Sequence, residues 1–153
     1  MSERYDKVLK FIMQKHQNQY DEGGNPYVLH PITVALMCNN ESEKIVALLH
    51  DILEKTDTKE EDLKTLKLLN SSELRAIKAL TRKKDMSYKD YIRRLFYYPL
   101  AIKVKKAELL HNMDLSRLSV VTEKDLERNK KYQKAYDFLN SIEFFYGSIR
   151  RDL

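Results

Sequence analysis

The chain of 153 residues is long enough for one domain with a substantial hydrophobic core. Charged residues make up 33% of it, the longest apolar runs reach only about five residues, and the N-terminus is charged, which excludes a membrane-spanning helix and a secretory signal peptide. With 3 Gly, 3 Pro and no Trp, the composition is typical of an all-α cytoplasmic protein.

The net charge of +5 suits a phosphate-rich ligand. Lys and Arg are interspersed with acids along the predicted helices, so most of them are expected to form solvated faces. A modest basic excess is not a nucleic-acid signature on its own, and we expect neither a nucleic-acid nor a membrane partner. The single Cys38 ends the apolar run 34–38 and is expected to be a buried structural thiol.

Apolar residues recur with a helical period from the N-terminus onward. The first helix is expected over residues 5–19, followed by a loop at the Gly-Gly-Asn-Pro sequence 23–26. Pro31 is expected to be the first residue of the second helix, with His30 held just outside it, because a residue before proline disfavours the helical conformation. The third helix is expected over residues 42–54.

Later helices are each opened by a residue that favours a helix start. These residues are Thr58, in a Thr-x-x-Glu capping box, then Ser71, Ser87, Pro99 and Thr122. We find no repeat, linker or low-complexity segment, so we predict a single-domain helical bundle over residues 1–153.

The last predicted helix carries an aromatic stripe. Its members are Tyr132, Tyr136, Phe138, Phe144, Phe145 and Tyr146. We interpret the stripe as core, with a homo-oligomer interface as the alternative.

An adjacent imidazole and carboxylate, His50 and Asp51, directly follow the apolar run 45–49 of the third predicted helix. Burying either group is costly unless it is paired or coordinates a metal. Neighbouring helical side chains diverge by about 100°, but a metal ion between the two directions can contact both. Glu54 lies one turn further on and would share that side. The alternative is a satisfied core histidine beside a surface acid.

A second polar cluster lies on the helix that starts at Pro99. Glu108, His111 and Asn112 stand at positions i, i+3 and i+4 and therefore share one face. They can point toward the same centre as His50. An ordinary polar helix surface is the alternative.

Three ordered segments together resemble the motifs of the HD-domain phosphohydrolases: residues 25–31, 50–54 and 104–113. They most resemble the hydrolase domain of the RelA/SpoT family and its small single-domain relatives, and the resemblance covers roughly residues 5–140. It implies an all-α HD-type bundle with a divalent metal, commonly manganese. It also implies removal of pyrophosphate from the 3′ position of guanosine tetra- or pentaphosphate (ppGpp or pppGpp).

The resemblance implies a metal site and a catalytic acid. His30, His50 and Asp51 match three metal ligands, and Glu108 stands where the family usually has an aspartate as the fourth. Glutamate is longer by one methylene, about 1.5 Å, which is enough to shift an ion in a tight site. Glu54 matches the acid that helps to activate the attacking water. Two imidazoles with two carboxylates suit Mn²⁺ or another first-row ion better than calcium.

The resemblance also implies a guanine-nucleotide pocket, in which Tyr27, Lys105 and Asn112 match substrate-binding residues. Two departures affect it. Lys55 stands where the family motif has a second acid, and Asp21 stands where the family places an arginine against the guanine. The metal site is therefore expected to be kept and the substrate site to be altered.

The motifs favour a metal-dependent nucleotide phosphohydrolase acting on ppGpp. Lys55 and Asp21 favour the alternative, a degenerate HD protein that binds a nucleotide or a protein partner without turnover. A third hypothesis, that the protein is a basic helical nucleic-acid binder, is supported by the net charge alone.

Overall fold

The computed structural model describes residues 2–152 and contains no β-strand within them, which confirms the all-α prediction. Its helices, in chain order, are α1 (Glu3–Lys15), α2 (Leu29–Leu36), α3 (Glu41–Leu49), α4 (Ile52–Lys55), α5 (Glu60–Leu66), α6 (Ser71–Leu80), α7 (Tyr88–Arg94), η1 (Leu95–Tyr97), α8 (Pro99–Met113), η2 (Leu115–Arg117) and α9 (Glu123–Asp152).

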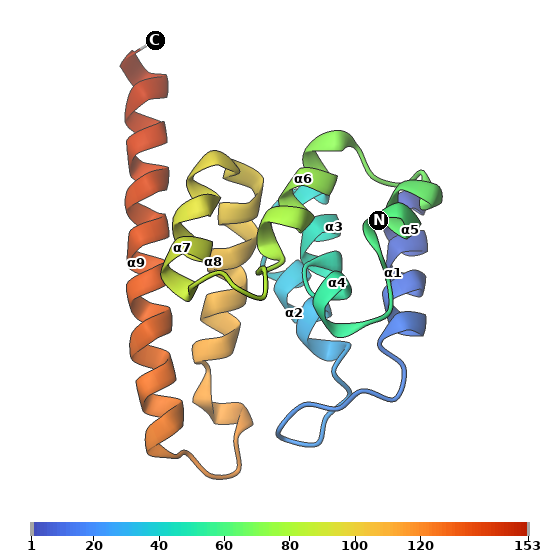
Figure 1. The fold of residues 1–153 in the computed structure, drawn as a ribbon, viewed down its shortest axis with the longest axis horizontal. Coiled ribbons are helices and arrows are strands. Elements are labelled where there is room, and N and C mark those ends of the chain that lie inside the picture. Colours follow the sequence, from blue (N-terminus) through green and yellow to red (C-terminus); the bar gives the residue numbers. More distant parts are fainter. Residues whose placement is uncertain (1, 153) are drawn as a thin grey trace.

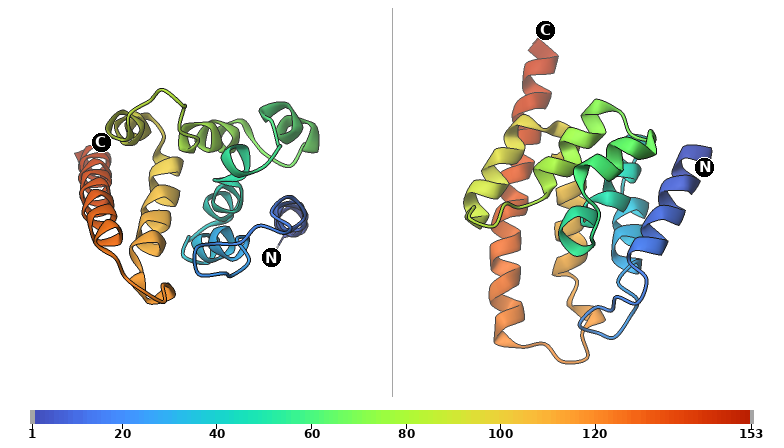
Figure 2. Two further views of the ribbon diagram at one scale, coloured as in Figure 1. Left: turned by 60° about the horizontal axis from the view of Figure 1, so that its bottom comes forward. Right: turned by 45° about the vertical axis from the view of Figure 1, so that its right-hand side comes forward.

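Helices α3 and α8 form the centre of the bundle. Helix α3 packs against α1, α2, α6 and α8, and α8 also contacts α2, α6 and α9 (Figures 1 and 2). Leu48 and Leu49 of α3 and Leu109 of α8 are fully buried. Each such side chain contributes about 1.5–3 kcal/mol through burial, so the two central helices are fixed by apolar contacts.

Local sequence signals place four helix starts correctly. Helix α6 begins at Ser71, α8 begins at Pro99, and Ser87 caps α7 by accepting a hydrogen bond from the N–H of Asp90. Before α9, the N–H of Thr122 donates to Asp125 at 2.8 Å. These signals act within one turn, which is why they can be interpreted without tertiary structure.

The first two helix boundaries differ from the prediction. Helix α1 ends at Lys15, not near Gln19; His16 caps it with φ and ψ of −91° and 10°, and the left-handed Asn18 (φ of 63°) then turns the chain away. Helix α2 begins at Leu29, so His30 is helical and Pro31 lies third in the helix rather than first. Proline is tolerated there because the N–H groups of the first turn have no partner within the helix.

The predicted cap of α5 is wrong by one residue. The helix begins at Glu60, and the carboxylate of Asp62 accepts the N–H of Lys59 at 2.8 Å. Thr58 is instead buried and accepts a hydrogen bond from the hydroxyl of Thr56.

The aromatic stripe of α9 is only partly core. Tyr132, Tyr136 and Tyr146 are half-buried beside the core, whereas Phe138, Phe144 and Phe145 are exposed. The six residues do not share one face, and α9, at 30 residues or about 45 Å, extends past the helices that it packs against (Figure 1).

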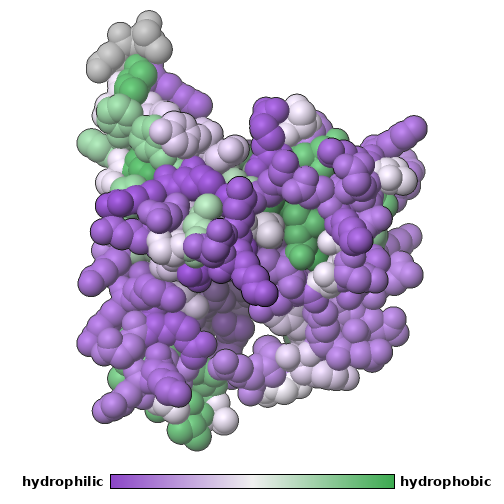
Figure 3. Space-filling model, in the orientation of Figure 1, coloured by the Kyte–Doolittle hydropathy of each residue, from purple (hydrophilic) through white to green (hydrophobic). Residues whose placement is uncertain are grey.

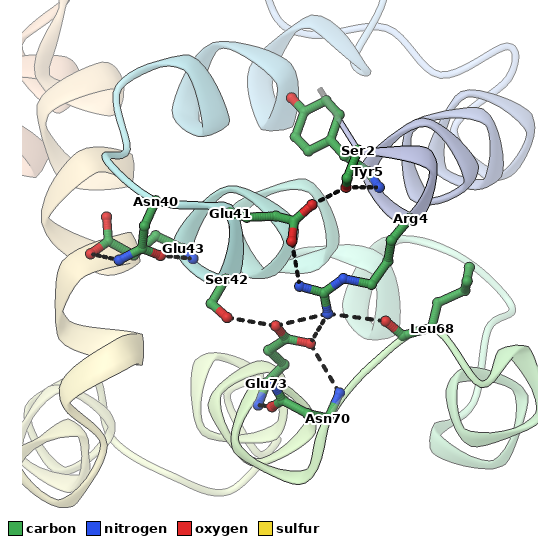
Figure 4. A network of polar contacts seen from close by, with 10 residues as sticks. All are labelled: Ser2, Arg4, Tyr5, Asn40, Glu41, Ser42, Glu43, Leu68, Asn70 and Glu73. Carbon is green, nitrogen blue, oxygen red and sulfur yellow. Dashed lines mark hydrogen bonds and ion pairs between the residues drawn. The ribbon is translucent and has the colours of Figure 1, made fainter.

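A polar network ties the N-terminal helix to the centre (Figure 4). Arg4 of α1 donates to both oxygens of Glu73 at 3.0 and 2.8 Å, and Glu73 has no exposed surface. Ser42 of α3 donates to the same carboxylate at 2.7 Å, and the N–H of Asn70 donates at 3.0 Å. One buried carboxylate therefore joins α1, α3 and α6.

Within residues 2–152, every helix is too short or too polar to cross a membrane.

Candidate functional site

The predicted continuous helix over residues 42–54 is broken at its functional centre. Helix α3 ends at Leu49, and Asp51 has φ and ψ of −101° and −1° before α4 begins. The ring nitrogen Nδ1 of His50 donates to the carbonyl of Ala47 at 2.6 Å, so a side chain takes an acceptor of the regular helix. The break matters because it brings His50 and Asp51 together.

Three donor atoms from two segments converge beside this break. Nε2 of His50 lies 3.2 Å from Nε2 of His30 and 3.2 Å from Oδ2 of Asp51, and His30 Nε2 lies 3.7 Å from the same oxygen. All three residues are buried, and their candidate ligand atoms lie within 4.8 Å of one another. His30 comes from α2, and the other two from the turn after α3.

The donor set fits a first-row divalent ion. Ligand atoms about 2.1 Å from such an ion are separated by roughly 3.0–3.5 Å at octahedral or tetrahedral angles, close to the observed spacings. The Ala47 carbonyl holds the Nδ1 proton of His50, which leaves the lone pair of Nε2 for a ligand.

The charges of the cluster are strongly coupled. Burial lowers the pKa of His50, but the adjacent Asp51 carboxylate outweighs it and raises the pKa to about 9. Burial and the neighbouring His50 lower the pKa of His30 to about 3. Burial opposes ionisation of Asp51, yet His50 and the Tyr27 hydroxyl hold its pKa well below the usual range. Without a metal, a second proton therefore lies on Nε2 of His50 beside Asp51, and an ion that binds there would displace it.

Two further residues hold the cluster from outside. The hydroxyl of Tyr27 donates to Oδ2 of Asp51, and Nδ1 of His30 lies 2.7 Å from Nδ1 of His111 on α8. The sequence placed His111 on one helix face with Glu108 and indicated that this face can point toward the same centre as His50, which agrees with the observed contact. Its contact joins residues 81 positions apart, which spacing along the chain does not reveal.

A cavity of about 710 Å³ opens over the cluster, and it is large enough for a nucleotide. One wall comes from the loop after α1, α2 and α4, and the other from α8, η2 and α9; Figure 3 shows the molecule hollowed below its centre. His30, Asp51, Glu54 and Asn112 all line it.

Comparison with known proteins identifies the family. A protein of Danio rerio named guanosine-3′,5′-bis(diphosphate) 3′-pyrophosphohydrolase MESH1 is 32% identical over 125 residues, which cover 72% of this chain and 68% of that protein. The chain belongs to this pyrophosphohydrolase family. No protein-family model matches the sequence.

Two further comparisons show how much of a longer protein the chain matches and which fold it shares. A protein of Borreliella burgdorferi with the same enzyme name is 32% identical over 122 residues, 70% of this chain but only 18% of that protein, so the chain spans a small part of it. A solved structure of a metazoan ortholog of SpoT superposes with a TM-score of 0.74 at 24% identity, covering 99% of this chain and 96% of that one. The fold is therefore the one that the motifs implied.

Glu54 and Lys55 of α4 are exposed and line the cavity. Oε1 of Glu54 accepts the backbone N–H of Arg82 at 2.7 Å, which fixes the carboxylate at the cavity wall. The ammonium of Lys55 lies 5.8 Å from the centre of the Tyr27 ring. A cation therefore stands beside the proposed catalytic acid.

Glu108, proposed as the fourth ligand, lies in the same cavity but is held by its own helix. It is buried, accepts from the ammonium of Lys105 at 2.9 Å and accepts more weakly from Asn112 at 3.4 Å. It is outside the group of three close ligand atoms, so its coordination of the metal stays a prediction. Burial raises the pKa of Glu108, but Lys105 outweighs it and keeps the carboxyl ionised.

Lys105 lies behind Glu108 and not among the cavity-lining residues. Its ammonium lies 4.9 Å from the centre of the Tyr91 ring. Lys105 holds Glu108 in this structure, and the substrate contact predicted for it stays a prediction.

Asp21 has a structural contact that sequence could not reveal. Its Oδ1 accepts the N–H of Asn25 at 2.9 Å and closes the loop before α2. Across the cavity Arg117 donates to the carbonyl of His111 at 3.0 Å, and Arg128 pairs with Asp125 at 2.6 Å. Positive charge at the cavity thus comes from Lys55, Arg117 and Arg128.

Proposed function

We propose that the protein is a metal-dependent phosphohydrolase that removes pyrophosphate from the 3′ position of guanosine 3′,5′-bis(diphosphate). The observation that carries the proposal is the convergence of His30, His50 and Asp51 at a nucleotide-sized cavity. The names of the relatives, which are pyrophosphohydrolases of this compound, support the substrate.

His30, His50 and Asp51 would hold the divalent ion, with Mn²⁺ as the proposed metal and Glu108 as the proposed fourth ligand. When bound, such an ion neutralises charge on the phosphate oxygens and lowers the pKa of a water molecule. Tyr27 donates to Asp51 and so fixes the direction of that carboxylate. Lys105 does the same for Glu108.

Glu54 is the proposed catalytic residue. Its carboxylate is exposed to the cavity and anchored through one oxygen by Arg82, which suits a group that orients the attacking water and takes its proton. The water attacks the phosphorus bonded to the 3′ oxygen, and the bond between that phosphorus and the 3′ oxygen breaks. The 3′ oxygen takes up a proton, so the products are GDP and pyrophosphate. Asn112, beside Glu108, is proposed to bind the nucleotide.

The cavity cations are proposed to bind the two diphosphate groups. Lys55 lies beside the reacting centre, whereas Arg117 and Arg128 lie on the opposite wall. The cavity is also lined by seven acidic residues, Asp21, Glu22, Asp51, Glu54, Glu108, Asp114 and Asp125. The bound divalent ion would therefore supply part of the positive charge that a polyanion needs there.

A product assay tests the proposal. The purified protein is incubated with Mn²⁺ and guanosine tetraphosphate, and nucleotides are separated by ion-exchange chromatography. We expect GDP with the wild type and none with His50→Ala, because the variant lacks one of the converging ligands. Unchanged substrate in the wild-type reaction would contradict the proposal.

Lys55 favours a second candidate, a protein that binds the nucleotide without turnover. A cation in place of the second acid strengthens binding of a polyanion but removes a proton acceptor. This candidate predicts saturable binding of guanosine tetraphosphate by calorimetry with no product. Hydrolysis that is lost in His50→Ala would exclude it.

A further inference from the structure

The two imidazoles of the candidate metal centre are oriented by different kinds of hydrogen-bond partner. His50 is held by a backbone carbonyl, that of Ala47, within its own turn. His30 is held by a side chain from another helix, because its Nδ1 lies 2.7 Å from Nδ1 of His111 on α8. The two ring planes are only 18° apart, which suits an N–H···N hydrogen bond in the ring plane.

The contact restricts the proton positions of both rings. One of the two Nδ1 atoms must donate and the other must accept. Nε2 of His30 points at the cluster, 3.2 Å from Nε2 of His50, and must offer a lone pair to bind a metal. The Nδ1 of His30 then carries the proton and donates to His111, whose own proton is on Nε2.

We propose that His111 is a positioning residue that holds His30 in the tautomer and ring orientation in which Nε2 faces the metal. The inference rests on the metal site of the proposed function but not on its substrate. Partners of this kind on metal-binding histidines typically change metal affinity by 10- to 100-fold when they are removed. His111 itself is half-buried on a central helix, so it can hold this geometry.

Two substitutions of similar size separate hydrogen bonding from packing. In His111→Asn the side-chain oxygen can take the position of Nδ1 and still accept from His30. In His111→Leu a methyl group takes that position and accepts nothing. Leu110→Ala, an exposed neighbour on α8, serves as the control.

Isothermal titration of each metal-free protein with Mn²⁺ tests the proposal. We expect affinity to fall 10- to 100-fold in His111→Leu and to stay within about threefold of the wild type in His111→Asn and in the control. A role in packing alone would give the opposite order, because leucine preserves apolar contacts better than asparagine. Equal affinities in all four proteins would overturn the inference alone, whereas no binding by the wild type would overturn the metal site as well.

A spectroscopic measurement reports on the tautomer directly. In the Zn²⁺-loaded wild type, nitrogen-15 NMR of the imidazoles should show a protonated Nδ1 on His30 that exchanges slowly with solvent. The signal should persist in His111→Asn and exchange rapidly in His111→Leu. A His30 protonated at Nε2 in the loaded wild type would overturn the proposal.

Discussion

Lys55 stands where the resemblance of the motifs predicts a second acid. Its ammonium lies over the Tyr27 ring and lines the cavity beside Glu54, so it affects both the charge at the reacting centre and the shape of the wall. Glu54, which directly precedes it, and Asp51, one turn earlier, keep the types that the chemistry needs.

Lys55→Asp should raise the rate of guanosine tetraphosphate hydrolysis on the order of tenfold. The change restores an acid next to Glu54, and a positioned acid or base contributes about 10²- to 10⁴-fold when fully effective. The measurement is GDP formed per minute at saturating Mn²⁺. Lys10→Asp, the same charge change on an exposed part of α1, should leave the rate unchanged. No gain in Lys55→Asp would show that Asp21 or Glu108 limits turnover instead.

Cys38 is a buried thiol, as predicted, with 8% of its surface exposed. Burial, aided by the Glu43 carboxylate, raises the pKa of Cys38 to about 11. Because only the thiolate is alkylated, iodoacetamide at pH 8 should react with the folded protein about two orders of magnitude more slowly than with the protein in denaturant. Mass spectrometry over time measures both rates. Equal rates would mean that the thiol is accessible and ionised in the fold.

At the scale of the helices, the carboxylate of Glu73 is the main polar connection between α1, α3 and α6 (Figure 4). It has no exposed surface, and Arg4 is the cation that pairs with it. Removing one partner of a buried ion pair leaves an uncompensated charge.

Arg4→Ala should therefore lower the free energy of unfolding by about 3 kcal/mol, measured by urea denaturation. Lys7→Ala removes an exposed ion pair on the same helix, with Glu3, and should cause no measurable change. Adding Glu73→Gln to Arg4→Ala should recover part of the loss, since an amide carries no charge. A loss in the double variant as large as in Arg4→Ala would show that packing, and not charge, links the helices.

The break between α3 and α4 is the second feature of the helices that shapes the site. A regular helix would separate the side chains of His50 and Asp51 around its axis. The side-chain hydrogen bond from His50 to Ala47 ends α3 and lets the two groups approach to 3.2 Å. The local irregularity therefore builds the candidate metal centre.

At the scale of the whole molecule, the candidate metal centre joins α2 to the end of α3, and His111 links it to α8. Residues 30 and 50 approach only in the folded chain, so an ion bound there stabilises the fold over the unfolded state. Free metal at 100 times its dissociation constant stabilises by about 2.7 kcal/mol.

Addition of Mn²⁺ to the metal-free protein should accordingly raise the melting temperature by roughly 5–10 °C at that concentration. The rise should depend on metal concentration, reverse with a chelator and vanish in His30→Ala. Calorimetry measures each transition. A rise that persists in His30→Ala would place the stabilising ion elsewhere on the molecule.

Much of this protein is determined by short stretches of its sequence. The capping residues before α7 and α9 and the proline at the start of α8 act within one helical turn, and they place these helices correctly. The apolar run before His50 and Asp51 indicates that these two groups are buried and need a partner, and the resemblance of the motifs adds His30 to them.

Other features depend on residues distant in the chain. The partner of His30 comes from α8, and the side chain of Lys105 is enclosed by Glu108 and Tyr91. Phe144 is exposed, whereas Ile142 and Tyr146 of the same helix pack against the bundle. Helix starts reflect hydrogen bonds between near neighbours, which the sequence records directly. The tautomer of an imidazole, the accessibility of a lysine and the burial of an aromatic ring reflect which helices meet, and that is settled by packing of the whole chain.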